Sequence, residues 1–538
     1  MKTRRWWMGG AAVVVALAMG GCMHASKPAA VASKPKQVTV LYVADLHGQL
    51  KAHPELFKRD GKETVEQAGG FARVAEAIRR IREERGGEVL VLDAGDTLQG
   101  SGVAAATQGK ALVPALNAIG FDAAVPGNWE VVYGVQALKA RAAELSYPLF
   151  ATNVIDEETG QRAYQPSFIK EVSGLKIAVV GYTDPDVPTR QPPGYSAGFH
   201  YQGTEALAAE LAAVREREKP DVVLVLSHVG LHKAVSITER LSGIDVHLSG
   251  DTHERTYQPI IRNGIWTVEP GAFGSFLGRL DLWVQDGKVV DKRWELIELT
   301  AKAYGEDPKV ASLVKTAVDA HPKLQQTLAH LDHTLMRYEV VETSLDRVIA
   351  DAVRAQAQTD IALSNGFRFG SPLVPGPFTQ DDLWTILPIN NLVKTGKVTG
   401  RQLRAFFERE LENVFSPDPE KRFGGWLPRP SGMSLRFDPQ APRGSRVREL
   451  KVAGEDVTED GVYTLAACER EGDAPDTLCR MPHVSDPKVM EVDVHQAVSR
   501  YLAQQGAVSA SLSGAPRVVA EGVKGPLRTQ LKELEDVK

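Results

Sequence analysis

The chain has 538 residues, enough for two or three domains with separate cores. Its composition of 43% hydrophobic and 24% charged residues is that of an ordinary globular protein, which excludes an intrinsically disordered chain. The net charge of -5 argues against a large nucleic-acid footprint, so no nucleic acid polymer is expected as a partner.

The first 22 residues have the features of an export signal. Arg4-Arg5 precede an apolar run at residues 11–19, which is too short to remain as a membrane-spanning helix. Gly20-Gly21-Cys22 resembles a bacterial lipobox, which predicts that Cys22 is lipidated; an ordinary cleaved signal peptide is the alternative. The sequence thus predicts a periplasmic protein that reaches a bacterial membrane only through a lipid anchor.

Buried strands alternate with amphipathic helices in the first half of the chain, which predicts a layered α/β domain. The expected strands are residues 38–44, 89–92, 123–125, 149–154, 177–181, 222–226 and 244–248. Residues 71–81 keep apolar side chains at helical spacing. Residues 277–296 read as a hairpin because Asp286-Gly287 separates two alternating runs.

The remaining sequence suggests a second domain and a short tail. The expected divisions are a signal peptide at 1–22, a tether at 23–37, a metal domain at 38–300, a helical connector at 301–340, a substrate domain at 341–523 and a charged tail at 524–538. Cys468 and Cys479 are close in sequence, and in an oxidising periplasm such a pair is expected to form a disulfide.

Polar side chains collect where the expected strands end. They are Asp45, His47, Asp96, Asn128, His228, Asp251 and His253. Singly, each has a structural explanation as a helix cap or a core histidine, but five such clusters at strand ends are hard to attribute to chance. Oxygen and imidazole donors without thiolates suit two divalent ions, with Mn favoured and Zn, Mg or Fe as alternatives. Asp96 is expected to bridge them.

The same blocks resemble the signature of the calcineurin-like metallophosphoesterases, and in particular their 5'-nucleotidase branch. The matching residues are Asp45-x-His47, Gly95-Asp96, Gly127-Asn128, His228 and Gly250-x-x-His253. The resemblance implies a four-layer α/β sandwich domain followed by an α+β C-terminal domain. It also implies two ligand sets, Asp45, His47, Asp96 and His253 for one metal and Asp96, Asn128, His228 and Asp251 for the other.

The resemblance further implies hydrolysis of phosphate esters in nucleotide catabolism. A metal-bound hydroxide would attack phosphorus in line, while the ions and Asn128 hold the developing charge. Asn365-Gly366-Phe367-Arg368 resembles the substrate-binding turn of the family's second domain. Asn365, Phe367 and Arg368 are therefore expected to bind a small phosphate ester, with the guanidinium holding its charged groups.

Three departures from the family pattern bear on the activity. Trp129 stands where the family has a histidine that protonates the leaving group, and an indole cannot transfer a proton. Asp251 replaces the usual first histidine of the Gly-His-x-His block and moves the metal preference toward Mn or Mg. Ala466-Ala467-Cys468 stands near the place of the family's base-stacking run, which is missing.

Two other functions stay open. Gly127-x-Trp129-Glu130-x-x-Tyr133-Gly134, Gly366-Phe-Arg-Phe-Gly370 and Phe415-Ser-Pro-Asp-Pro419 followed by Gly424-Gly425 resemble the Sox-type thiosulfohydrolases. That resemblance implies release of sulfate from a cysteine S-sulfonate on a thiol-bound carrier protein. The third possibility is a catalytically silent binding protein in which Trp129 plugs the site.

Overall fold

The computed structural model describes residues 34–422, 425–524 and 527–529. The predicted signal peptide, the lipidation site Cys22 and most of the predicted tether and tail lie outside these residues. Within the described part, no helix combines the length and the apolar character needed to cross a membrane.

The first sheet of the N-terminal domain carries the first three predicted strands. Its strand order is β15-β14-β1-β4-β5, with β1, β4 and β5 parallel to one another and β14 and β15 antiparallel. The strands are β1 (Lys36–Val43), β4 (Val89–Asp93), β5 (Ala123–Ala124), β14 (Phe276–Gln285) and β15 (Lys288–Glu298). The hairpin expected at residues 277–296 is thus present as β14 and β15, with Asp286 and Gly287 at its turn.

The second sheet has the order β12-β13-β11-β10-β8-β7. Its strands are β7 (Ser167–Val172), β8 (Leu175–Thr183), β10 (Val222–His228), β11 (Val246–Gly250), β12 (Ile260–Arg262) and β13 (Ile265–Val268). The central strands β8, β10, β11 and β13 run parallel, and β10 and β11 are buried along their whole length. Continuous apolar strands of this kind need cover on both faces.

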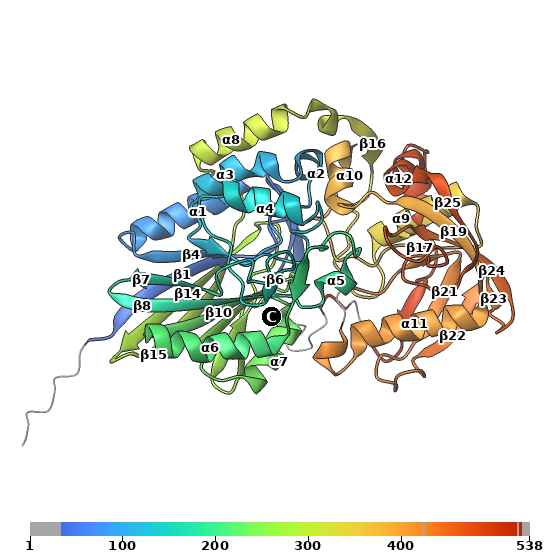
Figure 1. Ribbon diagram of the computed structural model, residues 1–538. Coiled ribbons are helices and arrows are strands. Elements are labelled where there is room, and N and C mark those ends of the chain that lie inside the picture. The colour runs from blue at the N-terminus through green and yellow to red at the C-terminus, as the bar shows by residue number, and fades with distance from the viewer. Residues whose placement is uncertain (1–33, 423–424, 525–526, 530–538) are drawn as a thin grey trace, which may run out of the picture. The chain divides into compact units, whose positions relative to one another are not determined.

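Helices cover the outer face of each sheet, which gives four layers (Figure 1). Apolar side chains of β1, β4, β14, β8, β10 and β11 form one core between the sheets. A second core joins the first sheet to α1 (Phe71–Glu84), α3 (Val113–Ile119) and α8 (Pro308–Asp319). A third joins the second sheet to α6 (Thr204–Glu218) and α7 (Leu231–Arg240). The layered α/β domain predicted from the sequence is confirmed.

The C-terminal domain contains a sheet of order β20-β17-β24-β19-β25 and another of order β23-β22-β21-β26. Their strands are β17 (Ile361–Leu363), β19 (Leu392–Thr399), β20 (Pro430–Ser431), β21 (Met433–Phe437), β22 (Val447–Val452), β23 (Glu455–Asp456), β24 (Val462–Cys468), β25 (Ser485–Asp493) and β26 (Val518–Ala520). The helices are α9 (Ser344–Ala357), α10 (Gln380–Ile386), α11 (Gly400–Phe415), α12 (Val494–Leu502) and α13 (Ala507–Leu512). Mixed sheets packed with helices give the expected α+β class.

Several elements were not predicted from the sequence. They include β2 (His53–Arg59), β3 (Lys62–Ala68), α2 (Gly102–Thr107), α4 (Val135–Glu144), α5 (Val187–Arg190), β9 (Phe199–Tyr201), β16 (Thr327–Leu331) and β18 (Gly376–Thr379). The strand expected at 149–154 is present only as isolated bridges at Leu149 and Phe150 and as β6 (Val154–Asp156), which begins at its last residue. The segment expected to be a helical connector contains α8 but also β16, which pairs with β18. Short, partly exposed strands such as β3 show too little apolar alternation to be recognised.

A buried ion pair anchors the turn that carries the predicted substrate residues. Arg337 donates from Nη2 to Asp346 Oδ1 at 2.8 Å and to Asn365 Oδ1 at 2.6 Å. Arg429 Nη1 lies 3.4 Å from the other Asp346 oxygen. All three charged side chains are buried. Asp346 thus neutralises two arginines in the core of the second domain.

Replacement of Asp346 by Asn is expected to lower the free energy of unfolding by about 3–5 kcal/mol, because it leaves buried guanidinium charge without a counterion. Urea denaturation followed by circular dichroism measures this. The matched change Asp456→Asn, on an exposed strand, is expected to shift stability by about 0.5 kcal/mol or less. Equal stability of the two variants would contradict the role of the buried pair.

Candidate metal centre

The predicted ligands converge at one edge of the two sheets because each follows the carboxyl end of a strand. Asp45 and His47 follow β1, Asp96 follows β4, Asn128 follows β5, His228 ends β10, and Asp251 and His253 follow β11. β1, β4 and β5 are neighbours in the first sheet, and β10 and β11 are neighbours in the second. Parallel neighbouring strands place their carboxyl ends together, so the seven side chains come from five adjacent loops.

The backbone of these loops is strained by positive φ angles at most of the predicted ligands. Five of the seven residues have positive φ, namely Asp45 (54°), His47 (46°), Asp96 (56°), Asp251 (96°) and His253 (57°). Non-glycine residues adopt this region at an energetic cost, and such residues cluster at functional sites. Gly127 is needed here because a Cβ at that position would lie 2.2 Å from Asp96 Oδ1.

The Asp45 carboxylate stands among three imidazoles. Its Oδ1 lies 3.3 Å from His253 Nε2, 3.8 Å from His47 Nε2 and 3.9 Å from His228 Nε2. The Nε2 atoms of His47 and His253 are 3.1 Å apart. Asp45, His47 and His253 together therefore form a compact group of possible ligand atoms.

A second group forms around His228. Its Nε2 lies 3.2 Å from Asp96 Oδ2, 3.2 Å from Asn128 Oδ1 and 3.9 Å from Asp45 Oδ1. Its Nδ1 lies 2.7 Å from the carbonyl oxygen of Ala94, which accepts a hydrogen bond and leaves Nε2 as the free acceptor. Asp96 Oδ2 is also 3.9 Å from His47 Nε2, so this carboxylate reaches both groups.

The donor set fits two divalent cations. Asp45 Oδ1 is fully buried and has no hydrogen-bond partner among the described residues. A buried carboxylate oxygen without a donor is costly unless a cation satisfies it. Burial lowers the pKa of His47 to about 4, so its imidazole is neutral at pH 7 and keeps a lone pair for a metal. Asp45, His47 and His253 would hold one ion, and Asp45, Asp96, Asn128 and His228 the other. Asp45 is thus a second candidate for a shared ligand beside Asp96, whose bridging role stays a prediction.

Asp251 lies beside the second group, but its carboxylate is already engaged. Its Oδ1 is 3.8 Å from His228 Nε2. Both carboxylate oxygens accept hydrogen bonds from Arg190, at 2.7 and 3.1 Å. Although burial alone would raise it, this guanidinium holds the pKa of Asp251 below its usual range. Asp251 is therefore shared between an arginine and the candidate metal position.

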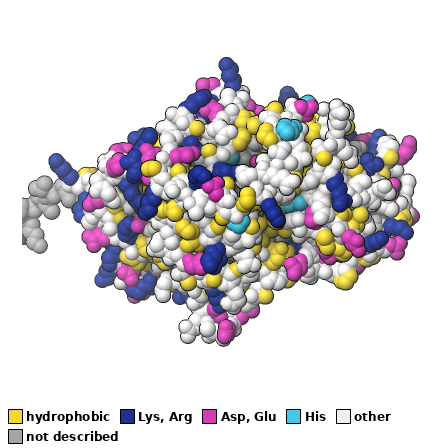
Figure 2. Space-filling model, turned by 90° about the horizontal axis from the view of Figure 1, so that it is seen from above, with side chains coloured by type: hydrophobic (Ala, Val, Ile, Leu, Met, Phe, Trp, Pro, Cys, Tyr) yellow, Lys and Arg dark blue, Asp and Glu magenta, His cyan; other side chains and the backbone are white. Residues whose placement is uncertain are grey.

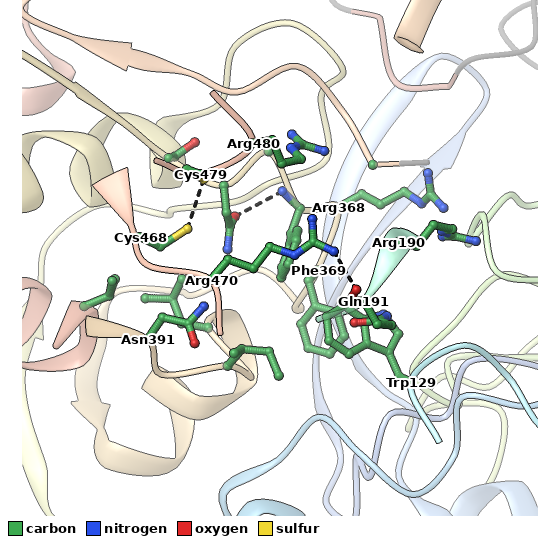
Figure 3. A pocket seen from close by; sticks show the side chains of 18 of the residues that line it. Trp129, Arg190, Gln191, Arg368, Phe369, Asn391, Cys468, Arg470, Cys479 and Arg480 are labelled. Atoms are coloured by element: carbon green, nitrogen blue, oxygen red, sulfur yellow. Dashed lines mark hydrogen bonds between the residues drawn. The ribbon is translucent and has the colours of Figure 1, made fainter. Parts of the chain in front are cut away.

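Arg368, one of the predicted substrate residues, enters the same cavity as Arg190 and Trp129 of the first domain (Figure 3). Arg368 donates from Nη2 to the Asp251 carbonyl oxygen at 2.8 Å, and its side chain is 8% exposed. Its Nε and Nη1 have no partner among the described residues. Asn365 Oδ1 accepts from Arg337 and from the Phe367 N–H, so it shapes the turn. One cavity is lined by Asp251, Asn365, Phe367 and Arg368 and by Asp96, Asn128 and His253.

Trp129 closes the metal side of the same cavity. Its backbone N–H donates to Asp96 Oδ1 at 2.7 Å. Its ring packs edge to face against Phe367, with the centroids 5.6 Å apart and the planes at 74°. Trp129 thus contacts residues of both domains.

Several residues of the site were missed from the sequence. Arg190, Gln191 and Tyr195 line the cavity from the first domain, and Arg470 and Arg480 line it from the second. Arg470 Nη2 donates to the carbonyl oxygens of Thr189 (3.0 Å) and Gln191 (2.6 Å), so it joins the two domains across the cavity. Arg190 ends the short helix α5, and Arg470 and Arg480 lie on loops. None of the three belongs to a recognisable motif, and the tertiary structure alone brings them to the site.

The two cysteines also line this cavity. Their Sγ atoms are 3.0 Å apart, and both are free thiols in this structure. This separation is within reach of a bond, and the predicted disulfide stays a prediction.

Glu130 organises the loops that carry Asp96 and Asn128. Its carboxylate accepts hydrogen bonds from the backbone N–H groups of Asp96 (2.9 Å), Thr97 (2.6 Å), Leu98 (3.2 Å) and Gly127 (2.6 Å). Four donors on one buried carboxylate fix both loops relative to each other. Its role is to position ligands rather than to bind metal.

Glu130→Gln is expected to lower the affinity for Mn²⁺ by about 10–100-fold, because an amide cannot accept all four hydrogen bonds. Calorimetric titration with Mn²⁺ measures the affinity. The exposed Glu158 provides the matched control, and Glu158→Gln is expected to bind as the wild type does. Unchanged affinity in the Glu130 variant would show that the loops hold their shape without it.

Comparison with known proteins gives two domain matches. A family model described as calcineurin-like phosphoesterase matches residues 38–255, and one described as the C-terminal domain of 5'-nucleotidase matches residues 325–469. The 5'-nucleotidase of Vibrio cholerae is 24% identical over 448 residues, covering 73% of this chain and 78% of that protein. The 5'-nucleotidase of Bos taurus is 25% identical over 471 residues, covering 78% and 79% respectively.

Two solved structures are similar over most of the chain. The sulfate thiohydrolase SoxB of Thermus thermophilus has a TM-score of 0.81 and 25% identity, covering 91% of this chain and 98% of that one. A 5'-nucleotidase precursor, also of Thermus thermophilus, has a TM-score of 0.76 and 20% identity, covering 91% and 100%. The predicted four-layer domain followed by a 5'-nucleotidase-type domain is confirmed.

Proposed function

We propose that this chain hydrolyses small phosphate monoesters at a two-metal centre. It belongs to the calcineurin-like metallophosphoesterases with a 5'-nucleotidase C-terminal domain and is a phosphoester hydrolase. Nucleotides are the expected substrate class, as the names of its relatives suggest. One observation carries the proposal: a single cavity joins the carboxylate and imidazole cluster to the buried, partly unpaired guanidinium of Arg368. That combination suits an anion held beside two cations.

Each residue has a defined task in this proposal. Arg368 would hold the charged groups of the substrate through its Nε–H or Nη1–H, which have no partner among the described residues. Asn128 would donate from its side-chain amide to the developing charge, while its Oδ1 faces the second ion. When bound, the two ions supply Lewis acidity and an activated water. Trp129 and Phe367 would exclude bulk water from the reacting group.

The metal identity and the location are also proposals. Oxygen-rich ligation supports Mn²⁺, with Zn²⁺, Mg²⁺ or Fe²⁺ as alternatives. The N-terminal sequence supports export to the periplasm and lipidation at Cys22. In Figure 2, basic and acidic side chains are interspersed over the face shown, which is consistent with a small-molecule substrate rather than a nucleic acid polymer.

A second candidate is release of sulfate from a cysteine S-sulfonate on a carrier protein. Trp129 favours it, because a thiolate leaves without protonation whereas an alkoxide needs a proton. The likeness to the sulfate thiohydrolase SoxB also supports it. A catalytically silent binding protein is the candidate from another class, and the nearly complete ligand set argues against it.

A hydrolysis assay of the purified protein with Mn²⁺ separates the three candidates. The substrates are a nucleoside monophosphate, p-nitrophenyl phosphate and a peptide with an S-sulfonated cysteine. Phosphate release that Asp96→Ala abolishes supports the phosphatase proposal. Sulfate release alone would replace it with the thiosulfohydrolase. No hydrolysis of any of these substrates by the fully metal-loaded protein would support the catalytically silent binding protein.

Trp129→His is expected to raise activity on nucleoside monophosphates by about 10–100-fold, the lower part of the range for a general acid. It is expected to change the rate with p-nitrophenyl phosphate little, because that leaving group needs no proton. Steady-state rates on both substrates measure the difference. Trp129→Phe, which offers no acid, serves as the control and should gain on neither. Equal gains on both substrates would assign Trp129 to packing alone.

The Cys468–Cys479 disulfide is expected in protein isolated from an oxidising compartment. It would close a loop of about ten residues and stabilise the fold by about 3 kcal/mol in the chain-entropy model. Intact mass spectrometry should show a deficit of two hydrogen atoms relative to the reduced protein. Two thiols that alkylate without prior reduction would refute the bond.

A further inference from the structure

A buried ion cluster lies directly behind the metal-ligand residues of the first domain. Arg190, at the end of α5, donates to both carboxylate oxygens of Asp251 and to Asp184. Lys233 Nζ lies 3.7 Å from Asp184 and 2.6 Å from Asp186. The side chain of Arg190 is 10% exposed and that of Asp184 is fully buried. Asp184 and Asp251 thus hold the Arg190 guanidinium in one position.

The other side of Asp251 faces the second group of metal ligands. Its Oδ1 lies 3.8 Å from His228 Nε2, and its backbone N–H donates to Asp45 Oδ2 at 3.0 Å. Its φ of 96° holds the residue in a conformation that side chains rarely adopt. Asp251 therefore stands between a fixed guanidinium and the position of the second metal.

Charge makes these two partners of Asp251 compete. A carboxylate that accepts a bidentate guanidinium has lone pairs engaged on both oxygens, so it binds a cation on its other side less strongly. The guanidinium charge also repels a divalent ion a few ångströms away in a buried, weakly screened site. Both effects weaken metal binding less at the position formed by Asp45, His47 and His253, because Arg190 contacts none of those residues.

We propose that Arg190 is a positioning residue that lowers the affinity of the second metal position by sharing Asp251 with it. The inference rests on the two-metal centre of the proposed function and is independent of the substrate. One ion is then held tightly by Asp45, His47 and His253, while the second exchanges. Arg190 also faces the substrate cavity, where Figure 3 shows it opposite Arg470. An anion that draws Arg190 away from Asp251 would tighten the second metal position.

Titration with Mn²⁺ of metal-free protein, followed by calorimetry and by the electron paramagnetic resonance of free Mn²⁺, tests the proposal. Wild type should show one tight and one weaker ion. Arg190→Gln should tighten the weaker ion by about tenfold or more and change the tight one little. Arg190→Lys keeps the buried charge with fewer contacts and should lie between them. In an Asp251→Asn background, Arg190→Gln should tighten the weaker ion less than it does in the wild-type background, because only the charge repulsion is left to remove.

Arg217→Gln is the control, since Arg217 is half exposed on α6 and pairs with Glu210 and Glu218 rather than with Asp251. It should leave both Mn²⁺ affinities unchanged. Circular dichroism and thermal unfolding verify that each variant is folded. Two ions in wild type with no tightening in either Arg190 variant would overturn the inference and leave the proposed function standing. One ion in wild type and in every variant would overturn both, whereas one ion in wild type and two in Arg190→Gln would support the inference.

Discussion

The structure depends on two buried carboxylates, Asp45 and Asp96, placed among imidazoles at the ends of parallel strands. Without a cation, Asp45 Oδ1 has no partner among the described residues, and burial of such an oxygen costs free energy. The strained backbone of the surrounding loops adds to that cost. Metal binding offsets both, which couples the stability of these loops to the chemistry they perform. Glu130, which holds four backbone N–H groups, keeps the loops in place.

The second domain completes the site and sets what it can bind. Arg368 brings a buried guanidinium to the metal edge of the first domain, and Arg470 bridges the domains on the other side of the cavity. The turn that carries Arg368 is fixed from behind by Arg337 through Asn365. An ion pair deep in the second domain core thus fixes the turn that carries Arg368, the residue proposed to bind the substrate's charge.

Much of the first domain could be predicted from sequence because its central strands are continuous apolar runs that end in polar residues. That pattern located β1, β4, β10 and β11 and the clusters that follow them. Arg190 could not be found in this way, because it lies on a short helix with no motif and meets Asp251 only through the fold. The ion pair between Asp251 and the guanidinium could not be predicted either, because the sequence shows a carboxylate but not the residue that it contacts. The β2–β3 hairpin escaped because β3 is largely exposed and β2, though mostly buried, lacks an alternating apolar pattern.

The central claim is that two metal ions lie between Asp45 and Asp96. Anomalous diffraction at the manganese edge, from crystals soaked in Mn²⁺, tests it most directly. The account predicts two peaks about 3.5–4 Å apart, one against His47 and His253 and one against Asn128 and His228. It also predicts lower occupancy at the second peak, beside Asp251 and Arg190. A single peak, or two peaks that share no carboxylate, would contradict the account.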